Sequence, residues 1–356
     1  MTSLANHQVE ELTHDIVQWG HELGFQQTAI TNTDLHRAEQ HLNQWLAADR
    51  HGEMSYMASH GIKRSRPEAL IPGTASIVSV RMDYLPEPLQ ATLDILESPE
   101  LGFISRYALG RDYHKLMRRR LQQLATRIEN AIGSFGYRVF VDSAPVMEKP
   151  LAANAGLGWI GKHTNLIHPK SGSYFFLGEV YTDLPLVGVA HAQRDHCGSC
   201  DRCITVCPTN AIVAPYQLDA RLCISYLTIE LKGAIPASLR PMIGNRIYGC
   251  DDCQIVCPWN RFAKQSAEID FIPRDELNAP TLVELFSWDE TTFLKRFEGS
   301  PIRRIGYSAW LRNLAVALGN APRSAAVTAS LIARKAHPSQ LVREHVVWAL
   351  ERHSNR

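Results

Sequence analysis

The feature that most constrains this chain is the confinement of all its cysteines to one short region. The eight cysteines of the 356 residues fall between positions 197 and 257. The first run, Cys197-Gly-Ser-Cys200-Asp-Arg-Cys203-Ile-Thr-Val-Cys207-Pro208, has the C-x₂-C-x₂-C-x₃-C-P spacing of bacterial two-cluster ferredoxins. The second run, Cys250-Asp-Asp-Cys253-Gln-Ile-Val-Cys257-Pro258, repeats the last three positions, and Cys223 is left to supply the missing ligand. The pattern predicts two 4Fe–4S clusters.

The spacing also predicts which cysteines share a cluster. Three closely spaced cysteines wrap one cluster, and the cysteine before proline ligates the other. One set would be Cys197, Cys200, Cys203 and Cys257. The other set would be Cys207, Cys223, Cys250 and Cys253. Such crossed ligation keeps the two clusters close together, which suits electron transfer.

Three other uses of the cysteines fit the pattern less well. Disulfides need an oxidising compartment, and nothing in the chain suggests export. Structural zinc sites often include histidine and do not favour the x₃-C-P ending. Free core cysteines would be scattered along the chain.

Length and composition indicate a protein without membrane spans. A chain of 356 residues predicts two or three domains. The N-terminus has no basic leader before an apolar run and no twin-arginine signal, and no apolar stretch reaches the roughly 18 residues of a membrane span. We therefore expect a cytoplasmic protein, without a membrane partner and monomeric.

The order of helix-like and strand-like patterns predicts an α+β fold. Strands are expected at 76–84, 137–142 and 174–181, and a long amphipathic helix at 113–132. Beyond Pro280 the pattern becomes helical, at 307–318, 325–335 and 341–352, and resembles HEAT-type repeats. The predicted domains are 1–190, 191–265 and 266–356.

The charge is unevenly distributed. The net charge is +1, yet residues 301–356 hold nine Lys or Arg and only two acidic residues. A basic helical tail, with Arg303, Arg304 and Arg312, is a candidate nucleic-acid contact. A solvated helix face explains the same pattern equally well.

Two further features could belong to a ligand site. Asp142 ends an apolar strand, where it could donate a proton or simply cap a turn. Gly156-Leu-Gly158-Trp-Ile-Gly161-Lys162 matches G-x-G-x-x-G but is not followed by a convincing helix. The glycines could allow backbone to approach a ligand or could form a plain turn.

Several blocks of sequence resemble the epoxyqueuosine reductases. The blocks are Arg106-Tyr-Ala-Leu-Gly-Arg-Asp-Tyr-His114, Val141-Asp-Ser-Ala-Pro145, Ala155-Gly-Leu-Gly-Trp-Ile-Gly-Lys162, Cys223-Ile-Ser-Tyr-Leu-Thr-Ile-Glu230, Tyr248-Gly-Cys-Asp-Asp-Cys-Gln254 and Cys257-Pro-Trp-Asn260. The resemblance implies a nitroreductase-like cobalamin-binding domain, a ferredoxin-like double-cluster module and a C-terminal α-helical HEAT-like domain that binds tRNA.

The resemblance also implies a reaction and its residues. Electrons from an unidentified donor would pass through two 4Fe–4S clusters to base-off cobalamin. Co(I) would attack the epoxide of epoxyqueuosine in the anticodon loop of tRNA, and Asp142 would donate a proton. The residues implied for the cobalamin pocket are Tyr107, His114, Asp142, Lys162, Thr164, Ser225 and Gln254.

Two other functions use the same clusters. A reductive dehalogenase also couples cobalamin to two clusters, although it typically has a twin-arginine leader and needs no basic tail. A ferredoxin-type carrier would pass electrons to a partner without chemistry of its own, and bound cobalamin would distinguish it.

Overall fold

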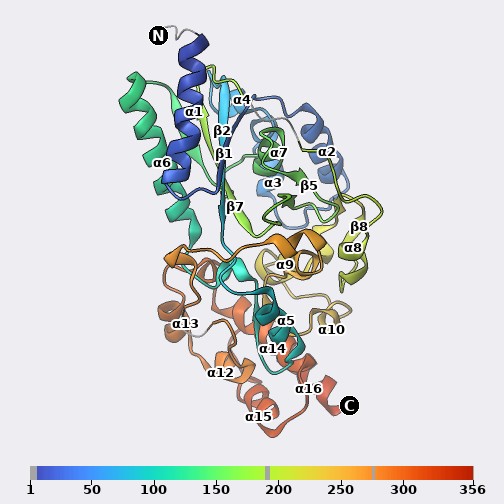
Figure 1. The fold of residues 1–356 in the computed structure, drawn as a ribbon. Coiled ribbons are helices and arrows are strands. Elements are labelled where there is room, and N and C mark those ends of the chain that lie inside the picture. The colour runs from blue at the N-terminus through green and yellow to red at the C-terminus, as the bar shows by residue number, and fades with distance from the viewer. Residues whose placement is uncertain (1–5, 189–192, 275–276, 356) are drawn as a thin grey trace.

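A four-stranded antiparallel sheet forms the centre of the N-terminal half (Figure 1). The structure, a computed structural model, describes residues 6–188, 193–274 and 277–355. The strand order is β1 (Gln27–Thr31), β2 (Ser76–Asp83), β7 (Phe175–Thr182) and β4 (Tyr137–Phe140). Every residue of the two central strands is buried. Both faces of the sheet are therefore covered.

Helices supply that cover. On one face, α1 (Asn6–Glu22) and α6 (Tyr113–Ile132) place apolar side chains against alternate residues of β2 and β7. Gly178 lets α6 come close, since a Cβ at this position would lie 2.9 Å from Leu121 Cδ1. On the other face, α7 (Glu148–Asn154) packs on β7.

The rest of the N-terminal half consists of short elements. They are α2 (His36–Ala47), α3 (Tyr56–Ser59), α4 (Pro67–Leu70) and the hairpin strands β5 (Trp159–Ile160) and β6 (Leu166–Ile167). Short 3₁₀ helices occur throughout the chain, at Gly61–Arg64, Arg106–Ala108, Ala220–Leu222, Pro258–Phe262, Ile269–Phe271 and Pro301–Ile305.

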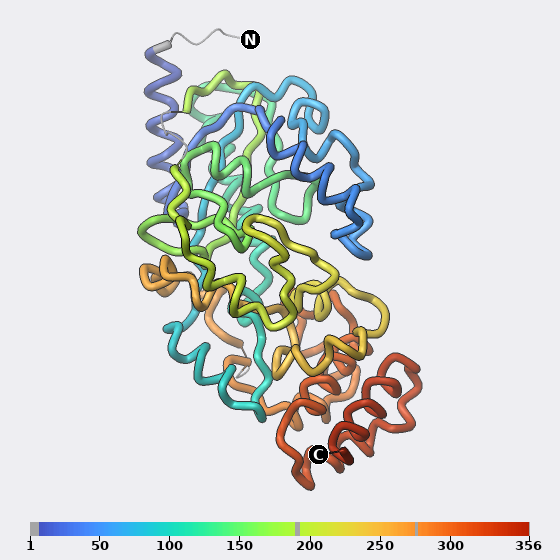
Figure 2. Tube along the Cα trace, turned by 90° about the vertical axis from the view of Figure 1, so that its right-hand side faces the viewer, coloured from blue at the N-terminus to red at the C-terminus, as the bar shows by residue number. Residues whose placement is uncertain are grey.

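The cysteine region crosses the middle of the molecule (Figure 2). Its elements are α8 (Arg202–Val206), β8 (Ile212–Ala214), β9 (Gln217–Leu218), α9 (Ile224–Ile229), α10 (Arg240–Ile243), β10 (Arg246–Tyr248) and α11 (Asp252–Ile255). Both cysteine–proline pairs follow a short helix, Cys207 after α8 and Cys257 shortly after α11. We refer to residues 196–260 as the cysteine module.

The C-terminal half is a layer of helices around one buried helix. The helices are α12 (Leu282–Ser287), α13 (Glu290–Arg296), α14 (Tyr307–Asn320), α15 (Ala325–Ala333) and α16 (Gln340–Ser354). Ten consecutive residues of α14, Trp310 to Gly319, are buried. α12, α10, β10 and α16 all pack against it.

An early segment of the chain belongs to this C-terminal core. α5 (Leu89–Glu97) and β3 (Phe103–Ile104) leave the sheet and lie beside the C-terminal helices (Figure 1). β3 pairs in parallel with β10, and Asn245 Nδ2 donates to the Ile95 carbonyl at 2.8 Å. The boundaries 1–190, 191–265 and 266–356 stay a prediction, and the first range contributes to two cores.

The predicted elements and fold class are confirmed, with small differences at element ends. The helix predicted at 113–132 is α6, and the strand predicted at 76–84 is β2. The strand predicted at 137–142 ends earlier, at Phe140, so Asp142 lies in the loop that follows. Among the residues that the structure describes, no helix is both long and apolar enough to span a bilayer.

Several arginines of the basic tail already have partners within the protein and are less available to nucleic acid than the sequence suggested. Arg312 is 0% exposed and donates to the carbonyls of Leu227, Leu231 and Gly233 at 2.7–2.9 Å. Arg334 donates to the Trp288 carbonyl at 2.8 Å, and Arg304 pairs with Glu230. The predicted nucleic-acid contact at Arg312 is therefore wrong, because its buried guanidinium hydrogen-bonds α14 to the cysteine module.

Replacing Arg312, and with it these hydrogen bonds, should destabilise the protein. We expect Arg312→Ala to lower the free energy of unfolding by about 2–4 kcal/mol, because it strands several buried carbonyls. Urea unfolding followed by circular dichroism measures the change. Arg303→Ala, at an exposed position, is the control and should change it by less than about 0.5 kcal/mol. Equal stability of both variants would contradict a stabilising role for the Arg312 hydrogen bonds.

Candidate functional site

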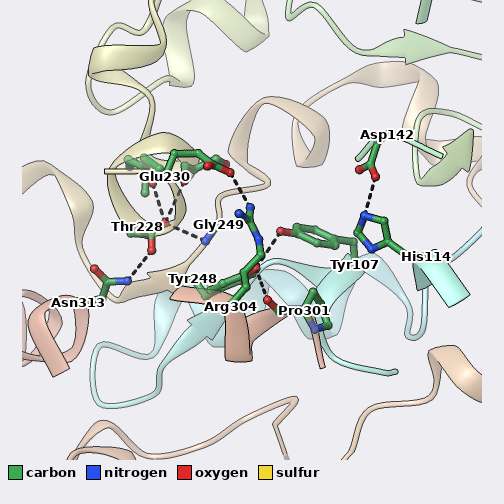
Figure 3. Close-up of polar contacts among 12 residues, drawn as sticks. Tyr107, His114, Asp142, Thr228, Glu230, Tyr248, Gly249, Pro301, Arg304 and Asn313 are labelled. Atoms are coloured by element: carbon green, nitrogen blue, oxygen red, sulfur yellow. Dashed lines mark hydrogen bonds and ion pairs between the residues drawn. The ribbon is translucent and has the colours of Figure 1, made fainter. Parts of the chain in front are cut away.

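Asp142 lies among hydrogen-bond donors at the start of α6. Its side chain is 38% exposed, in the loop after β4. The Tyr113 hydroxyl donates to one carboxylate oxygen, and His114 Nε2 lies 2.7 Å from the other (Figure 3). The carboxylate that the sequence singled out is therefore held by two side chains from another element.

His114 is a charged group at this site. Its Nδ1 lies 2.6 Å from Asp112 Oδ1, and Asp112 caps α6 by accepting from the His114 backbone amide. Although burial opposes its charge, the hydrogen bonds with Asp112 and Asp142 raise the pKa of His114 to about 9. His114 is therefore a protonated imidazolium at neutral pH, with both ring nitrogens occupied.

A pocket opens beside Asp142. Its cavity volume of about 110 Å³ lies below the ~300–1,000 Å³ of typical small-molecule sites, so the cavity can hold only part of a large ligand. One part of the wall is aromatic, with the rings of Tyr113 and Phe176 stacked at 3.8 Å. The polar lining residues are Asp142, Glu148, Lys149, Asn165, Ser173 and Gln254. Aromatic rings beside amide, hydroxyl and ammonium groups suit part of a ligand with polar substituents.

Gln254 joins this pocket to the cysteine module. Its Nε2 donates to the Ser173 carbonyl at 3.0 Å, just before β7. Asn260 Nδ2 donates to the Gln254 carbonyl at 2.6 Å, and Asn260 Oδ1 accepts from the Ser173 amide at 2.7 Å. All three residues are buried. The network holds the second cysteine run against the start of β7, beside the pocket.

The electrostatic influences of the thiols on one another follow the two predicted sets for the most part, and the sets themselves stay a prediction. Burial, followed by the charges of Cys257, Cys197 and Cys200, raises the pKa of Cys203 to about 11. Burial also raises the pKa of Cys223, Cys250 and Cys253. Cys207 contributes at Cys223, and Cys223 at Cys250 and Cys253. Cys253 is also influenced by Cys203, so the groups are neighbours.

These groups are defined by mutual electrostatics alone. Within 6–188, 193–274 and 277–355, no three Cys, His, Asp or Glu side chains meet closely enough to ligate one metal ion.

Lys162 supports the cysteine module and does not line the pocket. Its Nζ donates to the carbonyls of Gly198 and Cys200, at 2.6 and 3.0 Å. The preceding glycines are required by packing: a Cβ at Gly158 would lie 2.3 Å from the Ile167 carbonyl oxygen. The G-x-G-x-x-G match is thus part of the β5–β6 hairpin, in line with the plain-turn interpretation.

Thr164, Ser225 and Tyr107, which were also expected in the pocket, do not line it. Thr164 has a positive φ of 68°, and its carbonyl accepts from Lys149 Nζ at 3.2 Å. Ser225 lies beside the Cys223 thiol, which its hydroxyl and amide contact. The Tyr107 hydroxyl lies 3.4 Å from that of Tyr248, near the Arg304–Glu230 pair (Figure 3).

Sequence reasoning did not single out Tyr113, Glu148 and Lys149, which line the pocket. Tyr113 precedes His114 within a block that resembles the epoxyqueuosine reductases, and this position was the signal that could have identified it. Glu148-Lys149 follows the Asp142 loop by only a few residues.

Two family models match the chain. Residues 64–143 match the model described as "Epoxyqueuosine reductase QueG, DUF1730". Residues 196–260 match the "4Fe-4S double cluster binding domain".

Whole-chain relatives agree with these matches. Epoxyqueuosine reductase of Pseudomonas aeruginosa is 60% identical over 96% of this chain and 94% of its own length. That of Escherichia coli K12 is 55% identical over 96% and 89%. A crystal structure of epoxyqueuosine reductase with a tRNA-Tyr epoxyqueuosine-modified stem loop superposes with a TM-score of 0.87, at 28% identity, over 97% of this chain and 90% of that one. The chain therefore belongs to the epoxyqueuosine reductases, a family of oxidoreductases.

Proposed function

We propose that this enzyme reduces epoxyqueuosine to queuosine in the anticodon loop of tRNA. The observation that carries the proposal is the placement of Asp142, bonded to Tyr113 and His114, in a pocket adjoining the cysteine module. Relatives of the same name cover nearly the whole chain. One has been solved with an epoxyqueuosine-modified tRNA stem loop. Membership of this family disfavours both the dehalogenase and the simple electron carrier.

The eight cysteines would ligate two 4Fe–4S clusters. The ligand sets would be Cys197, Cys200, Cys203 and Cys257, and Cys207, Cys223, Cys250 and Cys253. The two electrostatic groups of thiols support this division. Thiolate is the ligand that such clusters take from proteins. The elevated thiol pKa values belong to metal-free cysteines, since a coordinating metal deprotonates them.

The lining of the pocket suits one edge of a base-off cobalamin, which would extend beyond the cavity. Tyr113 and Phe176 would contact the ring, while Lys149, Asn165 and Gln254 would bond its polar substituents. His114 offers no free ring nitrogen to cobalt, because Asp112 and Asp142 occupy both. When bound and reduced, the cofactor supplies a strong cobalt nucleophile for the epoxide. The hydrogen bond from Gln254 to the Ser173 carbonyl holds the cysteine module against this side of the pocket.

Asp142 and His114 would supply a proton to the epoxide oxygen. The imidazolium of His114 carries a proton at neutral pH, 2.7 Å from Asp142. Asp142 is partly exposed toward the pocket and can pass this proton on, while Tyr113 fixes its orientation. A solved Bacillus subtilis relative is described with an aspartate catalytic loop swung out of the active site. A mobile acid loop of this kind would admit the base.

The tRNA would lie over a basic groove near His114. Five basic residues line the groove: Arg111, Lys115 and Arg119 from α6 and the turn before it, and Arg274 and Lys295 from the predicted tRNA-binding range 266–356. The acidic residues Asp270 and Glu298 also line it, and Arg111 pairs with Asp270 at 3.6 Å. Asp112, which holds His114, lines the same groove. Phosphates bound here would place an unpaired anticodon base, which can be splayed out, near the pocket. The cytoplasmic location, monomeric state and electron donor stay predictions.

Removing the acid should stop turnover without emptying the site. We expect Asp142→Asn to lower kcat by about 10²–10⁴-fold, because an amide cannot donate the proton. Iron content and cobalamin absorbance should stay at wild-type levels. Conversion of an epoxyqueuosine stem loop, followed by mass spectrometry, measures the rate. Undiminished turnover would show that another group is the acid.

Removing one proposed ligand should affect one cluster. We expect Cys223→Ala, purified without oxygen, to lose up to one cluster's share of iron, since a cubane with three ligands is labile. Iron and sulfide assays with electron paramagnetic resonance of the reduced protein measure the loss. Ser225→Ala, beside the same cluster but supplying no thiolate, is the control. Unchanged iron content would contradict the assignment of Cys223.

Reversing charge in the groove should weaken tRNA binding. We expect Arg119→Glu with Lys295→Glu to raise Kd by about tenfold or more and to reduce the salt slope by ~1 for each lost phosphate contact. Filter binding at several salt concentrations measures both. Arg323→Glu, exposed in the turn after α14, is the control. An equal effect at Arg323 would place the contact on the basic tail.

A further inference from the structure

A glutamate with no hydrogen-bond partner lies in the buried centre of the sheet. Glu179 of β7 is opposite Ser79 of β2 and Phe140 of β4. Its side chain is 0% exposed, and neither carboxyl oxygen has a hydrogen-bond partner in the described part of the chain. Burial, with the charges of Glu148 and Asp142, raises the pKa of Glu179 well above its ordinary value. Burial at this point of the sheet therefore disfavours the charged form of Glu179.

Glu148 lies between this region and the pocket. It is the first residue of α7, the helix that packs on β7, and it lines the pocket with Asp142 and Lys149. Burial, then the charge of Asp142, raises the pKa of Glu148 to about 8, while Lys149 and His114 act in the opposite direction. Most Glu148 side chains therefore carry a proton at neutral pH.

Lys149 does not cancel this effect because its ammonium has other partners. Its Nζ donates to the Thr164 carbonyl at 3.2 Å and to Asn165 Oδ1 at 3.0 Å. The groups that act on Glu148 are thus Asp142, Lys149 and His114, with Glu179 and Tyr113 also within its field.

The proposed reaction needs more than one proton. Converting an epoxide to an alkene breaks two C–O bonds, forms one C=C bond and releases the oxygen as water. The balance requires two electrons, which a low-potential donor supplies through the proposed clusters, and two protons. The Asp142–His114 pair accounts for one proton. The second must reach the same oxygen inside the pocket.

We propose that Glu148 donates the second proton. The inference rests on the proposed function. Asp142 protonates the oxygen as the first C–O bond breaks, and Glu148 protonates it again as the second breaks and the alkene forms. Glu148 then regains a proton from solvent between turnovers. Glu179 supplies no proton, because it lies inside the sheet and does not line the pocket.

The test is Glu148→Gln, which keeps the shape of the side chain but cannot donate in this way. Turnover of an epoxyqueuosine stem loop is measured from pH 6 to 9 with excess chemical reductant. We expect a loss of at least about tenfold at pH 7. Wild-type turnover should fall as pH rises through about 8, and this limb should be absent in the variant. Turnover within twofold of wild type, with the same pH profile, would overturn the proposal.

Glu179→Gln is the matched control. It makes the same substitution at a buried carboxyl that does not line the pocket. We expect its turnover to stay within about twofold of wild type. An equal loss in both variants would show a general disturbance of buried carboxyls and overturn the role of Glu148. Wild-type protein that leaves epoxyqueuosine unchanged would instead reject the proposed function.

A second measurement needs neither substrate nor turnover. The unfolded chain releases the Glu148 proton near pH 4.5, whereas the folded chain keeps it until about pH 8. The wild-type protein therefore loses stability relative to Glu148→Gln as pH rises across this window. The difference in melting temperature between the two should change steadily from pH 5.5 to 8 in favour of the variant. A constant difference would show that Glu148 is ionised throughout and overturn the proposal.

Discussion

The buried hydrogen bonds among Ser173, Gln254 and Asn260 hold the cysteine module against the sheet. Gln254 comes from the second cysteine run, Asn260 from the turn after it, and Ser173 from the approach to β7. Gly172 has no side chain because a Cβ there would lie 2.0 Å from Asn260 Oδ1. These buried hydrogen bonds set the distance between the thiols of the second cysteine run and the pocket.

Local patterns were sufficient to predict the elements and the double-cluster module, while the division of the cysteines into two sets stays a prediction. The hydrophobic period of α6, the apolar runs of β2 and β7 and the cysteine spacing each depend on neighbours in sequence. The roles of Lys162 and Arg312 depend on tertiary contacts. Both donate to carbonyls in distant segments, and a lysine or arginine in sequence looks the same whether it meets a phosphate or a buried carbonyl.

In the candidate site, too, one residue was predictable from local sequence, whereas its partners depend on tertiary contacts. Asp142 was identifiable because it follows an apolar strand, yet its partners come from the first turn of α6, which packs across β7. The sequence placed Tyr113 and His114 in a conspicuous block without showing where they point. Electrostatics adds what the pattern could not: Asp112 and Asp142 raise the pKa of His114, while burial raises the pKa of Glu148 and Glu179.

The pairing of β3 with β10 joins segments that leave the ribosome far apart in time. Residues of the early excursion, Ile104, Ala108 and Leu109, complete a core whose other members come mostly from the last helices. During synthesis these apolar side chains must wait, exposed or covered by a chaperone, until the cysteine module and α14 emerge. The C-terminal half therefore completes its core only after the whole chain is made.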